Sequence, residues 1–189
     1  TAVGTNAMVA NTTGANNVAV GAGALDANTT GVSHTAIGYG ALGANTTGAS
    51  NVAVGANALD AMIDGDENVA FGADSLSSDT KGNKSTAIGY AALFTQNFTS
   101  STDSNNTAVG YASLFANTTG TGNTAIGLGA LDANTTANDN TAIGQLALSN
   151  NTTGANNTAI GQVAGFDNTT GSTNIYVGKD SGRSGSPGG

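Results

Sequence analysis

The acidic segment 64–68 places four oxygen-bearing side chains within five residues, and oxygen ligands of this kind are what calcium prefers. Asp64, Asp66 and Asn68 alternate as the first ligands of a calcium loop do. The glycine at the sixth position of such a loop and its distal bidentate glutamate are both missing. The pattern therefore favours a solvated acidic corner, with a calcium site as the lesser alternative. We expect no metal and no cofactor.

Five of the nine aromatic side chains gather between residues 86 and 123. Tyr90 and Tyr111 occupy equivalent places in two neighbouring sequence repeats, as do Phe94 and Phe115, and an insertion that begins at Phe98 lies between them. Stacked rings beside a protruding loop predict a platform for a sugar or a peptide. The alternative is aromatic stacking along a scaffold together with a tolerated insertion.

Groups that catalyse reactions are scarce. His34 is the only histidine, cysteine is absent, and no serine has a general base placed by a motif. The run from Gly38 to Gly43 matches a dinucleotide-binding string, but it lacks the strand-helix-strand context that gives the string its meaning. We therefore expect a protein that is not an enzyme, in which His34 has a hydrogen-bonding scaffold role.

The charge balance argues against two classes of partner. Twelve acidic and four basic side chains give a net charge of −8. A nucleic-acid-binding protein needs a basic stripe that displaces counterions from phosphates, and an anionic membrane surface would repel this chain. No apolar run approaches the ~20 residues of a transmembrane helix. We expect neither nucleic acid nor membrane contact for this segment, which opens within a repeat and is expected to belong to a longer protein.

A repeat of 17 residues sets the elements that position these groups. Each unit begins with a tetrad of the form Thr/Val-Ala-Ile/Val/Phe-Gly, whose first residue we number position 1. The units begin at Thr1, Val18, Thr35, Val52, Val69, Thr86, Thr107, Thr124, Thr141, Thr158 and Ile175. Nine of the ten steps are 17 residues long, and the step from Thr86 to Thr107 is 21. A fixed period predicts one supersecondary unit stacked many times.

Strand chemistry explains the unit. Positions 1 and 3 are β-branched or apolar and share one face of a short strand, which we expect to be the core face. Leucine at position 8, with alanine usually at position 10, predicts a second short strand. Glycine at positions 4 and 14 predicts corners with positive φ, and the Asn-Thr-Thr segment supplies turn hydrogen bonds. The fold class is all-β, a parallel β-roll or β-solenoid of about ten coils, with the position-17 asparagines stacked in an amide ladder.

Position 2 of the tetrad predicts how copies of the chain associate. A strand face of alanine and glycine opposite the core would allow close approach of neighbouring subunits, and the thin core favours such support. We expect a homotrimer packed through Ala19, Ala36, Ala53, Ala70, Ala87, Ala108, Ala125, Ala142 and Ala159. The repeat domain is expected to span 1–178, with a longer coil at 86–106, and 179–189 to form a flexible tail.

The tetrads preceded by asparagine, 51–55 (Asn-Val-Ala-Val-Gly) and 140–144 (Asn-Thr-Ala-Ile-Gly), resemble the N/S-V-A-I-G motif of trimeric autotransporter adhesin heads of the YadA-like type. Small residues three places after the glycine, as at Ser75 and Ser113, extend the likeness, and similar repeats occur in phage tail-fibre proteins. The resemblance covers 1–178. It implies a left-handed parallel β-roll, three chains side by side, and attachment at a cell surface or fibre tip. The period of 17 is longer than the family's commonest repeat, and the stretch lacks a coiled-coil stalk or anchor, so adhesin and fibre both stay open.

The expected function is an extracellular structural and adhesive module that binds a protein or glycan receptor multivalently. The candidate ligand surface is Tyr90, Phe94, Phe98, Tyr111 and Phe115. One alternative is an ice-binding solenoid, motivated by the position-12 threonines (Thr12, Thr29, Thr46, Thr118, Thr135, Thr152) but broken at Ile63. A spacer without a ligand is the other. The N-x-T sequons, for example at Asn11, follow from the turn chemistry.

Overall fold

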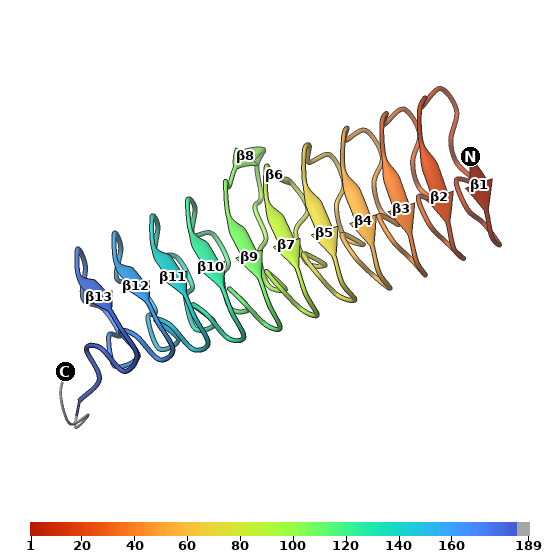
Figure 1. Cartoon of the computed structure of the whole chain (residues 1–189). Helices are drawn as coiled ribbons and strands as arrows, with labels where there is room; N and C mark the ends of the chain where they lie inside the picture. Colours follow the sequence, from red (N-terminus) through yellow and green to blue (C-terminus); the bar gives the residue numbers. More distant parts are fainter. Residues whose placement is uncertain (185–189) are drawn as a thin grey trace.

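Residues 1–184, which the computed structural model describes, form a parallel β-solenoid without helices (Figure 1). Each coil contributes one strand to the main sheet, and these strands stand side by side along the axis from β1 at one end to β13 at the other. This confirms the all-β solenoid of about ten coils. None of these residues belongs to a helix that could span a membrane.

The main sheet is assembled from the tetrads of the repeat. Its eleven strands are β1 (Ala2–Val3), β2 (Val18–Val20), β3 (Thr35–Ile37), β4 (Val52–Val54), β5 (Val69–Phe71), β7 (Thr86–Ile88), β9 (Thr107–Val109), β10 (Thr124–Ile126), β11 (Thr141–Ile143), β12 (Thr158–Ile160) and β13 (Ile175–Val177). They pair in parallel and in register, so that Ala125 faces Ala108 on one side and Ala142 on the other. Identical repeat positions therefore stack in columns along the solenoid, ~4.8 Å apart.

The second strand expected around positions 8 to 10 is not formed. This segment is a run of turns in which positions 6 and 8 take left-handed backbone conformations, for example φ 60° at Gly129 and 53° at Leu131. It still bonds from coil to coil, since the N–H of Leu131 donates to the carbonyl of Ala147 at 3.0 Å. The prediction failed because the alternation of two apolar positions does not distinguish a strand from a left-handed turn that buries one leucine.

The core lies on the opposite face of the strands from the one expected. The position-2 alanines predicted to form the subunit contact are 0% exposed and pack inside the chain itself: Ala19, Ala36, Ala53, Ala70, Ala87, Ala108, Ala125, Ala142 and Ala159. The leucines of position 8, such as Leu131, fill the space beneath them. Positions 1 and 3 face outward instead. The cross-section is narrow, so small residues fit on the strand side and a single leucine fills the opposite side.

The corner glycines at positions 4 and 14 of the repeat serve different purposes. Position 4 has the expected positive φ, 136° at Gly127, and a Cβ there would lie 2.5 Å from the carbonyl oxygen of Gly144. Position 14 does not have a positive φ. At Gly31 a Cβ would overlap the side chain of Asn28 and lie 2.5 Å from the carbonyl oxygen of Gly48. Glycine at position 14 is therefore favoured by close stacking rather than by backbone conformation, and Ala137 shows that the column admits one Cβ in the coil that begins at Thr124.

The solenoid continues beyond the predicted domain boundary at residue 178. Residues 179–184 continue the coil that begins at Ile175. The N–H of Asp180 donates to the carbonyl of Gln162, and the carbonyl of Ser181 accepts from the N–H of Gly165. Tyr176 replaces alanine at position 2 and packs against the end of the core. The predicted tail, 179–189, thus begins with six residues that bond to the previous coil, and its remainder, 185–189, lies outside the described residues.

Candidate functional surfaces

The asparagines at position 17 form the expected ladder. They are buried, and each carboxamide oxygen accepts from the next backbone N–H, as Asn140 Oδ1 does from Asn157 at 2.9 Å. Each Nδ2 donates to the position-14 carbonyl of the next coil, as Asn140 does to Gly154 at 2.9 Å. One side chain thus satisfies a donor and an acceptor of the neighbouring coil, which makes this column part of the scaffold.

His34 occupies the same column and imitates asparagine. Its Nδ1 accepts the N–H of Asn51 at 3.2 Å, so Nε2 carries the proton and donates to the carbonyl of Gly48 at 2.6 Å. Burial lowers the pKa of His34, and these two backbone hydrogen bonds oppose that shift only in part. The neutral imidazole is therefore the form that fits, in agreement with a scaffold role.

A second amide ladder at position 11 was missed. Nδ2 of Asn28 donates to Oδ1 of Asn11 at 2.8 Å, and Asn45 repeats the contact on Asn28 at 3.0 Å. A further ladder runs through Asn117, Asn134, Asn151 and Asn168. The signal was available, because asparagine recurs at position 11 as regularly as at position 17. These asparagines are also the predicted sequons, and burial of their side chains withholds most of them from modification.

Met62 interrupts this second ladder. It takes the place of the asparagine that would donate to Asn45, and Oδ1 of Asn45 consequently has no hydrogen-bond partner. In the next coil the carboxylate of Asp79 accepts from Nε2 of Gln96 at 2.7 Å. A carboxylate has no hydrogen to donate, so Asp79 ends the row without needing a partner at Met62.

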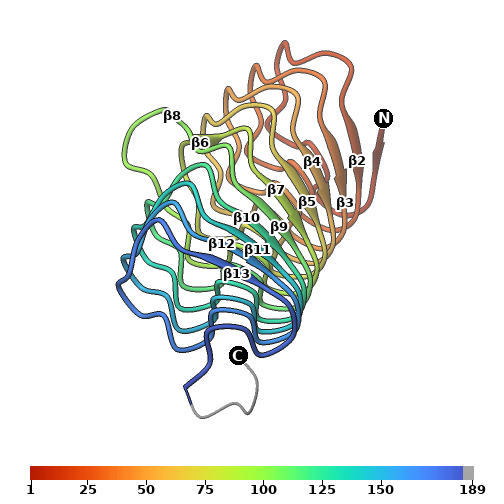
Figure 2. The same cartoon turned by 60° about the vertical axis from the view of Figure 1, so that its left-hand side comes forward.

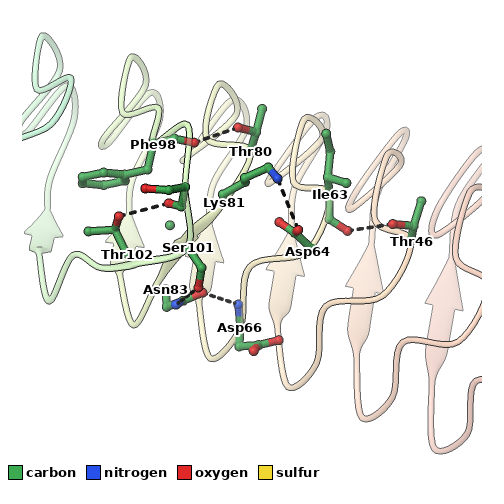
Figure 3. A network of polar contacts seen from close by, with 12 residues as sticks. Thr46, Ile63, Asp64, Asp66, Thr80, Lys81, Asn83, Phe98, Ser101 and Thr102 are labelled. Carbon is green, nitrogen blue, oxygen red and sulfur yellow. Dashed lines mark hydrogen bonds and ion pairs between the residues drawn. The ribbon is translucent and has the colours of Figure 1, made fainter.

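The acidic segment 64–68 does not gather its oxygens around one point (Figure 3). Asp64 pairs with Lys81 at 3.5 Å, and Oδ1 of Asp66 accepts the N–H of Ala49 at 2.7 Å. Asn68 is buried in the position-17 ladder, where it donates to Gly82. Within residues 1–184 no cluster of three or more His, Cys, Asp or Glu side chains is placed to hold a metal ion. Asp64, Asp66 and Asn68 therefore each bond a different partner.

The four extra residues of the sixth coil form a loop that projects from the solenoid (Figure 2). The loop carries β8 (Thr102–Asp103), which pairs in parallel with β6 (Gly82–Asn83) of the previous coil. Lys84 bonds Asp103 at 2.5 Å, and this contact raises the pKa of Lys84. The hydroxyl of Thr80 donates to the carbonyl of Phe98 at 3.0 Å (Figure 3). The loop is thus ordered by polar contacts to the preceding coil.

The predicted aromatic platform is only partly assembled. Tyr90 and Tyr111 stack with ring centroids 5.4 Å apart, and Phe94 and Phe115 stack at 5.3 Å. The two tyrosines are about half exposed, whereas Phe98 is buried and 6% exposed. Tyr90 comes shortly after β7 of the main sheet, whereas the insertion carries β8, which pairs with β6 in a separate two-stranded sheet. The structure therefore joins the four ring residues in two stacked pairs but separates them from the insertion.

The position-12 threonines use their hydroxyl hydrogens within the fold. Thr118 donates to the carbonyl of Thr135 at 3.0 Å, and Thr135 donates to that of Thr152 at 3.2 Å. Thr46 makes the same contact to Ile63 at 3.2 Å (Figure 3). This column is therefore part of the coil-to-coil bonding, which weakens its case as a water-ordering array.

The geometry places the chain in the class of parallel β-solenoid repeat proteins. Comparisons with protein-family models, with curated proteins and with solved structures give no significant match. The likeness to adhesin heads and tail fibres therefore depends on the repeat motif alone and stays a prediction.

Proposed function

We propose that the chain is a structural and adhesive module of an extracellular fibre or surface adhesin, and that it acts as a homotrimer. The observation that carries the proposal is an apolar stripe on the outer face of the main sheet. Its members at position 3 include Val20, Ile37, Phe71, Ile88, Ile126, Ile143, Ile160 and Val177, each more than a third exposed.

The stripe is continuous because the strands stack in register. Ten steps of ~4.8 Å and strands ~10 Å long give an apolar area on the order of 500 Å² per chain. Exposed patches of this size on soluble proteins commonly mark interaction sites. The outward face of positions 1 and 3 replaces the buried alanine face as the subunit contact. A trimer would cover three such stripes at its axis, in keeping with the adhesin-head resemblance.

Light scattering on the purified chain tests the association. The expected mass is that of three chains, and the double variant Ile126→Glu/Ile143→Glu should shift it to a single chain by burying charges in the contact. Thr136→Glu/Thr153→Glu, at exposed positions of the same two coils, is the matched control and should stay trimeric. A wild-type chain that remains a stable monomer at high concentration contradicts the proposal.

The receptor surface is proposed to be the stacked pair Tyr90 and Tyr111 with the adjacent Phe94 and Phe115. Amphipathic rings held rigidly on a scaffold bind sugar or peptide surfaces at little entropic cost, and three copies add avidity. Attachment of particles coated with the protein to host cells or matrix should fall with Tyr90→Ala/Tyr111→Ala and not with Leu128→Ala, which truncates the next exposed residue of that column.

Whole-coil deletions separate this adhesive surface from a spacer without a ligand. Removal of 124–157 takes away two coils and should preserve attachment, whereas removal of 86–123 should abolish it. A spacer would tolerate both deletions equally.

An ice-binding solenoid is the second candidate function. The outer face of the main sheet is a better candidate for the ice-binding surface than the column of position-12 threonines. Thr124, Ile126, Thr141 and Ile143 belong to a regular outward array of hydroxyl and methyl groups. Both candidates need the same face, so they exclude each other. Thermal hysteresis from a monomeric chain supports ice binding, and a trimer without hysteresis rules it out.

A further inference from the structure

A cavity of about 470 Å³ opens on one side of the solenoid, where positions 5, 6, 9 and 10 of the first four coils meet. We call it the coil-3 hollow, because its centre lies over the coil that begins at Thr35. Its lining includes Asn6, Asp26, Tyr39, Gly43, Asn57 and Asp60.

The hollow is open because position 9 of coil 3 lacks a side chain. The coils on either side carry Asp26 and Asp60 at this position, and coil 3 has Gly43. The backbone of Gly43 is not left-handed, and an added Cβ would lie 3.1 Å from the Gly40 carbonyl oxygen and 3.5 Å from Oδ1 of Asp26. No turn requires this glycine, and its effect is to leave space between two carboxylates.

Tyr39 stands beside the gap in the same coil. Its side chain is 69% exposed, and the same position in the adjacent coils holds only Ala22 and Ala56. Tyr90 and Tyr111 cover each other by stacking, whereas no ring within residues 1–184 stacks on Tyr39. Tyr39 therefore offers a flat aromatic face next to the hollow, of the kind that receives the C–H face of a sugar ring.

Asp26 and Asp60 are the acidic residues of the hollow, and the distance between them limits which ligands can contact both. They lie two coils apart, so their backbones are separated by about 9–10 Å, too far for one calcium ion to bind both. The ion pairs formed among residues 1–184 all use other acidic residues, so neither carboxylate is paired with a cation. A ligand between them must donate hydrogen bonds from opposite edges and must not be an anion.

We propose that the coil-3 hollow binds one pyranose sugar unit without negative charge, stacked on Tyr39 and hydrogen-bonded at opposite edges by Asp26 and Asp60. An amino sugar fits best, since its ammonium group adds charge attraction to one carboxylate. The inference goes beyond the adhesive surface proposed above, because it needs neither the trimer nor the rings of coils 6 and 7.

NMR titration of the isotope-labelled chain with methyl glucoside, glucosamine and glucuronate tests the site. A ligand with so few atoms should bind in the millimolar range. We expect glucosamine and methyl glucoside to shift amide signals of coils 2 to 4, with glucosamine about threefold tighter and glucuronate about tenfold weaker than methyl glucoside, since charge decides the order.

Two variants remove the site by different routes. Tyr39→Ala removes the stacking face, and Gly43→Phe fills the gap with a residue that the repeat already accepts at this position in Phe94, Phe115 and Phe166. Both should abolish the shifts. Asp132→Asn is the matched control, because Asp132 holds the same position in coil 8 outside the hollow, and it should leave them unchanged.

Several results overturn the assignment. They are the absence of shifts with either uncharged or amino sugar, shifts that survive in both site variants, and glucuronate binding as tightly as glucosamine. Free arginine binding more tightly than glucosamine, with the same dependence on Tyr39, assigns the hollow to a basic protein side chain instead. The NMR shifts do not depend on the oligomeric mass. Failure of the sugar site can therefore be distinguished from failure of the proposed trimer.

Discussion

His34 Nε2 donates to the carbonyl oxygen of Gly48 at 2.6 Å, the contact that Asn51 makes to Gly65 with its Nδ2 at 2.7 Å one coil later. The imidazole can replace the carboxamide only while Nδ1 is free to accept the N–H of Asn51. A proton on Nδ1 would place two N–H donors against each other inside the core, and the hydrogen bond would be lost.

Acidification should therefore weaken the fold through His34. Burial lowers its pKa below the ordinary value of 6.5, so the unfolded chain takes up the proton first. The contribution of neutral His34 to the free energy of unfolding is fully present above pH 6.5. It is lost as the pH falls from 6.5 to the pKa of His34 in the folded state, by at most about 1.4 kcal/mol per pH unit. Urea unfolding at pH 7.5 and 5.5 measures the loss, and His34→Asn should remove it. An identical pH dependence in both proteins contradicts the assignment.

Loss of a rung from the position-11 ladder should cost far more than loss of an exposed neighbour. Asn134→Ala leaves Oδ1 of Asn117 without its donor, and it leaves Nδ2 of Asn151 with only one of its two acceptors, the Gly154 carbonyl. We expect a loss of about 2–4 kcal/mol in the free energy of unfolding, because both groups stay buried. Thr136→Ala, an exposed change in the same turn, should stay within about 0.5 kcal/mol. Equal effects in denaturant titrations would argue against the ladder.

Two glycines two residues apart should respond differently to alanine. At Gly127 a Cβ would lie 2.5 Å from the Gly144 carbonyl, and we expect Gly127→Ala to cost more than about 4 kcal/mol or to prevent folding. Gly129 is also left-handed, but its column already carries alanine at Ala91 and Ala112. Gly129→Ala should therefore cost only about 1–2 kcal/mol. Thermal melts of the two variants compare them directly, and a reversed order would be inconsistent with the stacking of position 4.

The insertion of coil 6 should be removable. Replacement of residues 97–103 by Thr-Thr-Gly, the turn of coil 7, restores the 17-residue period and deletes β8. The solenoid should still unfold cooperatively, with Tm lower by about 5–10 °C because the buried Phe98 and the contacts to β6 are lost. Circular dichroism follows both properties. A variant that no longer folds would show that the loop is part of the scaffold.

The repeat predicted the strands at the tetrads, the coil number, the long sixth coil and the position-17 ladder, because each follows from the period and from residue type. It did not predict which strand face is inside. A period of two shows that Val52 and Val54 share a face, but the direction of that face depends on the room inside the coil, which admits Ala53 and not a pair of valines. The sequence also failed to predict that Phe98 is buried, and Phe98 was assigned to the candidate ligand surface. The path of an inserted loop depends on contacts with the preceding coil, such as the hydrogen bond from Thr80 to the Phe98 carbonyl.

The repeat pattern could not predict the coil-3 hollow either. The string from Gly38 to Gly43 was set aside because it lacks a strand-helix-strand context. Gly43, however, is not required by the fold, and only the stacking of the coils places it between Asp26 and Asp60. A missing side chain has no periodic signature, so it becomes visible only when neighbouring coils are superposed.

Met62 divides the position-11 amide ladder into two separate hydrogen-bonded segments. In each segment every carboxamide points its N–H toward the amino-terminal end, so the bond dipoles align and polarise one another. That mutual reinforcement stops between Asn45 and Asp79. Since a stacked array is held together by the interactions between neighbouring coils, the contact between Asn45 and Met62 contributes one hydrogen bond fewer to the stack than the equivalent contacts elsewhere in this ladder.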